Sequence, residues 1–345
     1  MKRFTVIRMG LIFSFPAFCA DLPRWTWLTV KNFDTQERKE NEQKEWILFS
    51  KTKMLPFTQL LFSWNAQRPV RGYFRFKVQI YNETRHRWER WLTMIDWGAT
   101  IQRSYKQELS KRNASYHHVR LELPKRQFAT AVRIRVEVHD GACLSDLVRI
   151  AINTVDLSHF MHQPAASLSA LPSVSILGVP LRSQMVLDHP KKEVICSPTS
   201  ASMLASFLNK EPVDPVLFAQ GAYDTGLGAY GSWPFNTAHL FEILHGNYAC
   251  TVKRLHSFEE LHQHLCHHMP VVVSVRGPLA GGATPYASGH LLVVIGWDRE
   301  RQKVLCNDPA FDADNKVRVA YDASAFIEAW ERSRRLAYVC TKVGQ

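Results

Sequence analysis

The sequence predicts an α+β chain of two domains, an antiparallel β-sandwich followed by a domain in which helices precede a meander of strands. Its 345 residues exceed the usual size of one domain. The first half alternates apolar and charged residues with period two, as half-buried antiparallel strands do. The second half combines helical periodicity with short apolar runs, which is typical of an α+β domain.

Residues 1–20 are predicted to be a signal peptide. A basic head at 2–3 precedes an apolar stretch at 9–18, and small residues surround the expected cleavage site at 19–20. We therefore expect an exported protein, periplasmic or secreted. The alternative is that this apolar stretch is a buried first strand. Beyond this leader no run of 18 apolar residues occurs, so no transmembrane segment is predicted.

Residues 21–157 are assigned to the sandwich. Alternating runs bounded by turn residues predict strands at 59–64, 72–80, 118–123 and 131–138. Two Trp-rich patches, one at Trp64 and one spanning Trp88, Trp91 and Trp97, could line a glycan or peptide groove. The alternative interpretation is that these rings fill the core.

The positive charge of the chain belongs to its first half. Residues 21–157 hold 24 Lys and Arg against 15 Asp and Glu, an excess of nine, whereas residues 158–345 hold 16 of each kind. Such a field would attract an anionic surface such as a phospholipid or an acidic glycan. A solvated basic face is the alternative. Without an aromatic-interleaved RNA motif or a DNA-reading helix, no nucleic-acid partner is predicted.

A Ser-, Ala- and Pro-rich stretch with almost no charge predicts a linker at 158–178, which assigns the second domain to 179–345. In that domain, apolar periodicity predicts helices at 198–209, 233–245 and 257–268. Apolar runs predict strands at 270–275, 291–295 and 303–306.

Cys196 is the candidate nucleophile. It stands just before the predicted first helical turn, which Pro198 marks. Free backbone N–H groups and the helix dipole favour negative charge at this position, and the thiolate is the reactive form of cysteine. The alternative is a buried structural cysteine, which is common for this residue type.

His290 and Asp308 are the candidate base and orienting acid. His290 leads an apolar strand, and turn residues at 298–302 connect it to a returning strand that ends at Asp308. If the hairpin is centred in that turn, position 308 lies opposite 290–292, within side-chain reach of the imidazole. A carboxylate there would fix the tautomer and stabilise the charged ring.

Gln184 is the candidate oxyanion donor. It precedes Cys196 by twelve residues and could direct its side-chain amide at the charge that forms in acyl transfer. The backbone N–H of Cys196 would be the second donor.

The second domain resembles the stand-alone C39-like cysteine peptidases, which have a papain-like fold. Five motifs in order carry the resemblance: Val179 to Gln184, Cys196 to Ser200, Gly231 to Ala238, Gly289 to Leu291 and Asn307 to Ala310. The resemblance implies that Cys196 is the nucleophile, His290 the general base, Asp308 the orienting residue and Gln184 the oxyanion donor. Members with a similar leading half place a β-sandwich before the peptidase.

Four residues are predicted to contact substrate. The stretch that contains Trp233, Phe235 and Asn236 resembles a cleft wall of that family, an apolar rim with one amide that suits an extended peptide. Packing at the start of a helix explains it equally well. Tyr230 has glycines nearby and could lie on a mobile loop beside this wall.

Disulfides, metals and cofactors leave weaker signals. The seven cysteines stand at 19, 143, 196, 250, 266, 306 and 340. Without the leader and Cys196, five remain for at most two bridges, with no basis for choosing partners. His264 and His268 have a spacing that can hold a metal but lack a carboxylate ligand, so no metal site is predicted. Phosphate-loop and dinucleotide signatures are absent, so no cofactor is predicted.

These features predict an exported cysteine peptidase that cleaves a peptide or protein substrate through an acyl-enzyme. An amidase or acyltransferase acting on cell-wall or protein amides is an alternative, because all these reactions share one tetrahedral intermediate. A non-catalytic surface-binding adhesin is a further alternative. The intact set of Cys196, His290 and Asp308 argues against it.

Overall fold

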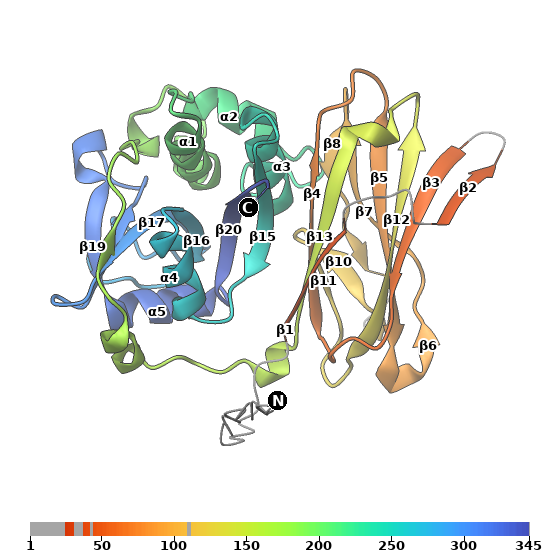
Figure 1. The fold of residues 1–345 in the computed structure, drawn as a ribbon, viewed down its shortest axis with the longest axis horizontal. Helices are drawn as coiled ribbons and strands as arrows, with labels where there is room; N and C mark the ends of the chain where they lie inside the picture. The colour runs from red at the N-terminus through yellow and green to blue at the C-terminus, as the bar shows by residue number, and fades with distance from the viewer. Residues whose placement is uncertain (1–24, 31–36, 42–43, 109–111, 345) are drawn as a thin grey trace, which may run out of the picture.

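The computed structural model describes residues 25–30, 37–41, 44–108 and 112–344. Two domains lie side by side, and an extended segment joins them along the lower edge of the molecule in Figure 1. Within the described residues, no helix is long and apolar enough to cross a membrane. The signal peptide predicted at 1–20 lies outside these residues.

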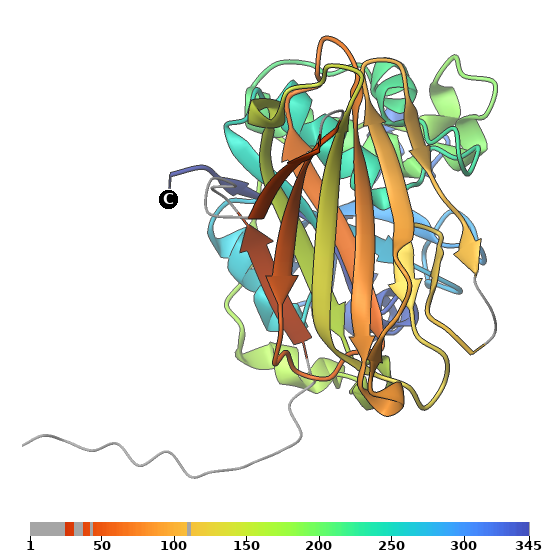
Figure 2. The same ribbon diagram turned by 90° about the vertical axis from the view of Figure 1, so that its right-hand side faces the viewer.

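The first domain is a sandwich of two antiparallel sheets, as predicted (Figure 2). The first sheet has the order β1 (Trp25–Val30), β13 (Leu147–Val155), β4 (Gln59–Ala66), β11 (Arg120–Glu122), β10 (Ser115–His117) and β9 (Gln107–Glu108). The second has the order β2 (Glu37–Asn41), β3 (Lys44–Lys51), β12 (Ala129–His139), β5 (Tyr73–Asn82), β7 (Leu92–Gly98) and β8 (Gln102–Ser104), with β6 (Arg87–Trp88) paired to β5. The four predicted strands correspond to β4, β5, β11 and β12.

Period-two burial builds the core of the sandwich. β5 alternates half-buried and buried positions along its whole length, as half-buried strands must. The core that it shares with the first sheet includes Trp64 and Trp97, which are both fully buried. Trp88 and Trp91 are only half-buried, and each stacks on an arginine of β12 on the outer face. Trp64 and Trp97 therefore fill the core, whereas Trp88 and Trp91 do not.

The second domain is built on one antiparallel sheet of the order β15 (Tyr248–Arg254), β20 (Leu336–Lys342), β16 (Val271–Val275), β17 (His290–Asp298), β18 (Lys303–Asn307) and β19 (Arg318–Asp322), with β14 (Val174–Ser175) paired to β17. Its helices are α1 (Cys196–Asn209), α2 (Pro215–Ala222), α3 (Trp233–Ile243), α4 (Phe258–Cys266) and α5 (Ala323–Arg332). Figure 1 shows α1, α2 and α3 on one side of the sheet and α4 and α5 on the other. The predicted elements correspond to α1, α3, α4 and β16 to β18, whereas α2, α5, β15, β19 and β20 were not predicted.

The predicted hairpin of β17 and β18 is confirmed. Val293 lies opposite Asn307, and a bulge between Val294 and Gly296 shifts the register by one residue nearer the turn. Asp308 directly follows the last paired residue of β18, which places it near the beginning of β17.

The two domains are joined by a buried interface as well as by the linker. On α3, Phe235 lies edge-on to Trp64 of β4, with ring centroids 5.5 Å apart, and belongs to the sandwich core. On β15, the N–H of Cys250 donates to Oδ1 of Asn65 at 3.2 Å, and its carbonyl accepts from Nδ2 at 2.6 Å. Arg254, at the end of β15, donates to a glutamine side chain of β4 at 2.6 Å. These contacts hold the sandwich against α3 and β15 of the second domain.

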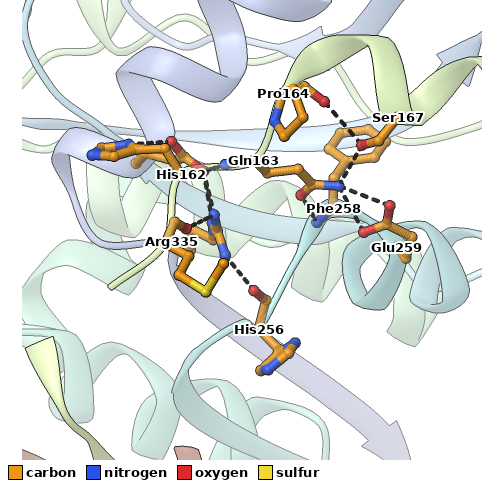
Figure 3. Close-up of polar contacts among 10 residues, drawn as sticks. His162, Gln163, Pro164, Ser167, His256, Phe258, Glu259 and Arg335 are labelled. Carbon is orange, nitrogen blue, oxygen red and sulfur yellow. Dashed lines mark hydrogen bonds and ion pairs between the residues drawn. The ribbon is translucent and has the colours of Figure 1, made fainter. Parts of the chain in front are cut away.

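Polar contacts hold the linker on the second domain (Figure 3). The backbone N–H of Gln163 donates to Glu331 at 2.8 Å. Its side chain donates to both oxygens of Glu259, at 2.8 and 2.7 Å, and accepts from the N–H of Phe258 at 2.8 Å. Arg335 pairs with Glu331 and donates to a linker carbonyl at 2.6 Å. These contacts order the segment against α4 and α5.

Removing the Asn65 side chain should destabilise the protein. Asn65→Ala leaves the N–H and C=O of Cys250 buried without their partners, which should lower the free energy of unfolding by about 2–4 kcal/mol. Urea denaturation of the full chain measures this, with Asn247→Ala at an exposed asparagine as the control. Equal stability of the two variants would contradict the importance of this contact.

Candidate active site

Cys196 is the first residue of α1 and is half-buried. Pro198 stands in the first turn, where its fixed φ angle favours a helix start. Ser200 donates from its hydroxyl to the carbonyl of Leu291 in β17 at 2.9 Å. This contact ties the first turn of α1 to the beginning of β17. The sulfur therefore lies where unpaired N–H groups favour an anion and where β17 presents His290.

The structure brings His290 and Asp308 to Cys196. His290 opens β17 directly after Gly289, whose φ of 96° is one that glycine adopts without strain. Nε2 of His290 donates to Oδ1 of Asp308 at 2.7 Å. The thiol of Cys196 is hydrogen-bonded to the same ring. Since Nε2 is hydrogen-bonded to the carboxylate, the nitrogen that is hydrogen-bonded to the sulfur is Nδ1.

Two tyrosines that no sequence pattern marked complete the surroundings of Asp308. The hydroxyls of Tyr286 and Tyr321 both donate to Oδ2 of this carboxylate, at 2.7 and 2.6 Å. The N–H of Ala310 donates to Oδ1 at 3.0 Å. Tyr286 also stacks on His290, with ring centroids 4.3 Å apart and planes within 9°. The carboxylate is therefore fully bonded in a site from which water is excluded, with 0% of its residue exposed.

The electrostatics are those of a thiolate beside an imidazolium. Burial opposes ionisation of Cys196, but the charge and hydrogen bond of His290 and a backbone hydrogen bond from Leu291 outweigh it and lower the pKa of the thiol. Burial also opposes the charging of His290, yet Asp308 and Cys196 raise its pKa to about 10. Burial likewise disfavours the charged form of Asp308, but His290 and a hydrogen bond from Tyr321 lower its pKa.

Gln184 lies at the same end of the domain. Its backbone N–H donates at 2.8 Å to the carbonyl of Pro309, the residue after Asp308. Its Nε2 donates at 2.7 Å to the carbonyl of Lys192, in the turn that leads into α1. That bond uses one of the two hydrogens on Nε2, and Oε1 has no hydrogen-bond partner among the described residues. The oxyanion role of Gln184 stays a prediction.

Phe235 and Asn236 do not line a cleft, contrary to the prediction. Phe235 is 1% exposed because it packs into the sandwich core. Asn236 is fully buried, and its Nδ2 donates to the carbonyls of Tyr230 and Ser232, both at 2.9 Å. Packing at the start of α3 accounts for both residues. The amide of Asn236 holds the preceding loop in place and does not reach a substrate.

Tyr230 and Trp233 stay predicted substrate contacts. Both side chains are half-buried. Tyr230 packs edge-on against His189, with ring centroids 5.1 Å apart, and His189 belongs to the loop that runs into Cys196. Tyr230 is thus linked to the approach to the nucleophile through one aromatic contact.

In the part of the chain that the structure describes, no group of three or more His, Cys, Asp or Glu side chains is placed to hold a metal ion. In the histidine-rich segment, Sγ of Cys266 lies 3.5 Å from Nδ1 of His262. Nε2 of His262 donates a hydrogen bond to the carbonyl of Pro172 at 2.8 Å, so Nε2 carries the proton.

A thiol at a helix start, paired with an imidazole that a buried carboxylate orients, is the arrangement of a cysteine-type hydrolase. Residues 176–338 match the Peptidase_C39 like family. This part of the chain is therefore similar to the peptidases of that family, and its site has the arrangement of a cysteine-type peptidase. No curated protein matches the chain.

Two solved structures are similar to parts of the chain. Xylellain, a cysteine protease from Xylella fastidiosa, has 14% identity and a TM-score of 0.35, over 55% of this chain and 93% of that chain. A structure described in terms of the promiscuous specificity of carbohydrate-binding modules from the β-sandwich superfamily has 12% identity and a TM-score of 0.19, over 39% of this chain and 53% of that chain.

Replacing Tyr321 by phenylalanine should weaken the site without dismantling it. Tyr321→Phe removes one donor to Asp308 but keeps the ring, so the free energy of unfolding should fall by about 1–3 kcal/mol. Asp308 keeps its bond to His290, and kcat/KM should fall only about 10-fold for the loss of one such bond. Thermal unfolding and peptide hydrolysis measure the two effects, with Tyr248→Phe as a control outside the site. If Tyr321→Phe matched the wild type in both, the hydroxyl would have no role there.

Proposed function

We propose that this protein is an exported cysteine peptidase that hydrolyses peptide bonds with Cys196, His290 and Asp308 as a catalytic triad. The observation that carries the proposal is the unbroken set of contacts from the thiol through the imidazole to the buried carboxylate. The family match supports a peptide or protein as substrate.

In the proposed reaction, the Cys196 thiolate attacks the scissile carbonyl carbon, and the carbonyl electrons move to oxygen as the C–S bond forms. Backbone N–H groups at the start of α1 and the amide of Gln184 would stabilise that oxyanion. His290 gives its Nδ1 proton to the leaving amine as the C–N bond breaks, which leaves a thioester. His290 then takes a proton from water as the water oxygen attacks the thioester carbon, and the C–S bond breaks to release the acid and restore the Cys196 thiolate. Asp308 holds the ring throughout.

A peptidase transfers the acyl group to water, whereas an acyltransferase transfers it to an amine. The full chain is incubated with a peptide library in water, with and without an added primary amine, and products are identified by mass spectrometry. If the protein is a peptidase, both samples should contain cleaved peptides with free carboxylates. Amine adducts as the main product would favour the acyltransferase alternative. An amidase would release amines from amides while leaving peptide bonds intact, and binding without any product would favour the adhesin.

Export is a separate proposal, supported by the basic, apolar and small residues of the leader at 1–20. Mass spectrometry of the native protein should show an N-terminus near Asp21 in the periplasmic or culture fraction. A chain that retains Met1 and stays in the cytoplasmic fraction would refute it.

We also propose that the outer face of the second sandwich sheet binds an acidic polysaccharide. The guanidinium of Arg135 lies between Trp46 and Trp91, 4.7 and 4.6 Å from their ring centroids, and that of Arg133 lies 3.9 Å from the centroid of Trp88. Trp88 also lines an open pocket of about 640 Å³. Indole faces suit sugar rings and guanidinium groups suit their carboxylates. The excess of nine basic residues in this half supports an anionic ligand.

Retention on immobilised polygalacturonate tests this surface. The full chain carrying Cys196→Ala should bind at about 50 mM salt and elute by about 0.5 M, because salt screens exposed charges. Arg133→Ala with Arg135→Ala should abolish retention, whereas Arg301→Ala, at an arginine whose side chain is 83% exposed in the second domain, should not. Equal retention of all variants, or binding to phosphatidylglycerol vesicles without binding to the polysaccharide, would overturn the proposal.

A further inference from the structure

Cys250 and Cys340 occupy directly opposed positions on β15 and β20. Their residues are 0% and 1% exposed, and the cysteines of the described residues all carry free thiols. Burial, and then a hydrogen bond to Cys340, raise the pKa of the Cys250 thiol. The two sulfur atoms therefore meet in a dry space between neighbouring strands.

The register of this pair brings its side chains close together. The N–H and the C=O of Cys250 both bind Asn65 of the sandwich, so neither group points toward β20. In an antiparallel ladder such a residue forms a non-hydrogen-bonded pair, whose Cα atoms lie about 4.5 Å apart. Disulfides span Cα separations of about 4.4–6.8 Å. The two strands can therefore be bridged where they stand.

A buried cation of the sandwich acts electrostatically on Cys250. Arg149 of β13 is 8% exposed, and its Nε has no hydrogen-bond partner among the described residues. Its charge opposes the rise in the pKa of Cys250, but burial and Cys340 outweigh it, so the thiol is the favoured form in the folded chain. A thiolate is the species that attacks a disulfide, so the exchange takes place while the chain folds, before burial raises the pKa of Cys250.

We propose that Cys250 and Cys340 form a cross-strand disulfide when the chain folds in the presence of a small-molecule disulfide donor. The Cys250 thiolate attacks the donor, which leaves a mixed disulfide and one donor thiolate. The Cys340 thiolate then attacks the Cys250 sulfur and displaces the second donor thiolate. The two protein thiols lose two protons and two electrons, and the donor gains them as two thiols.

The bridge fastens the strand on which the two domains meet. β15 is the edge strand of its sheet and carries Cys250 and Arg254, which bind the sandwich. A covalent link to β20 closes a loop of about 90 residues, which restricts the unfolded chain. We expect the oxidised protein to melt roughly 10 °C above the reduced one.

The test is disulfide mapping of the full chain carrying Cys196→Ala, refolded with oxidised and reduced glutathione or with dithiothreitol alone. After blocking with N-ethylmaleimide and digestion with trypsin, the oxidised sample should contain peptide 211–253 joined to peptide 336–342. The reduced sample should contain both peptides alkylated. Because the readouts are a mass and a melting temperature, the result is independent of peptidase activity.

Single-residue controls separate this bridge from general effects of oxidation. Cys340→Ala should remove the linked peptide and the rise in melting temperature, whereas Cys306→Ala, at another buried thiol of the sheet, should keep both. The proposal fails if the oxidised chain has both peptides alkylated, if Cys250 is joined to a different cysteine, or if oxidation leaves the melting temperature of the parent unchanged.

Discussion

Cys196→Ala should abolish peptide hydrolysis and labelling by an iodoacetamide probe. In the proposed reaction the sulfur of Cys196 forms the thioester, so we expect kcat/KM to fall by at least about 10⁴-fold, as when other covalent nucleophiles are removed. Labelling should fall to background because the lowered pKa of Cys196 makes it the reactive thiol at neutral pH.

The exposed cysteines have to be removed for that experiment to be clean. Cys143 and Cys266 are exposed and would react slowly with any electrophile. Labelling is therefore compared in a Cys143→Ser, Cys266→Ser background, with Cys306→Ala as a matched loss of a buried thiol. Undiminished labelling of the Cys196→Ala variant would reject this residue as the nucleophile.

Asp308→Asn should leave the chain folded and lower kcat/KM by about 10²- to 10⁴-fold, because the amide can present the wrong group to Nε2 of His290 and misplace the tautomer. The pH profile should change as well. Asp308 raises the pKa of His290, which is about 10, so activity in the wild type should persist until the imidazolium loses its proton near that pH. Without the carboxylate charge the pKa of His290 falls, and the alkaline limb should move to lower pH.

A matched control lies on the same hairpin. Asp298 ends β17 and accepts from the N–H of Arg301 at 3.0 Å in the turn, outside the site. Asp298→Asn should therefore keep both the rate and the alkaline limb. An alkaline limb that stays in place in Asp308→Asn would show that this carboxylate does not set the charge of His290.

Much of the candidate site could be predicted because its signals are local. Pro198 marks the start of α1, and the turn after β17 fixes which residues of the hairpin face one another, so the meeting of His290 with Asp308 follows from chain order. The bulge after Val294 shifts the register by one residue, too little to separate them.

Other features depend on contacts between distant segments, and no local pattern contains them. Tyr286 and Tyr321 reach Asp308 from a loop and from β19. Phe235 lies in a stretch whose residues suit an apolar rim, yet the sandwich covers its side chain. This burial results from the packing of α3 on β4, which the local sequence does not show. The pairing of Cys250 with Cys340 likewise needs the order of strands in the sheet.

The ionisation of Cys196 tests the central claim most directly. The ultraviolet absorbance of the thiolate, measured as the difference between the wild type and Cys196→Ser across a pH titration, reports this sulfur alone. We expect a thiolate signal that persists below the pH of about 8.5 at which an ordinary cysteine ionises, and that Asp308→Asn diminishes. A signal that emerges only at or above that pH, in the wild type and in Asp308→Asn alike, would contradict it.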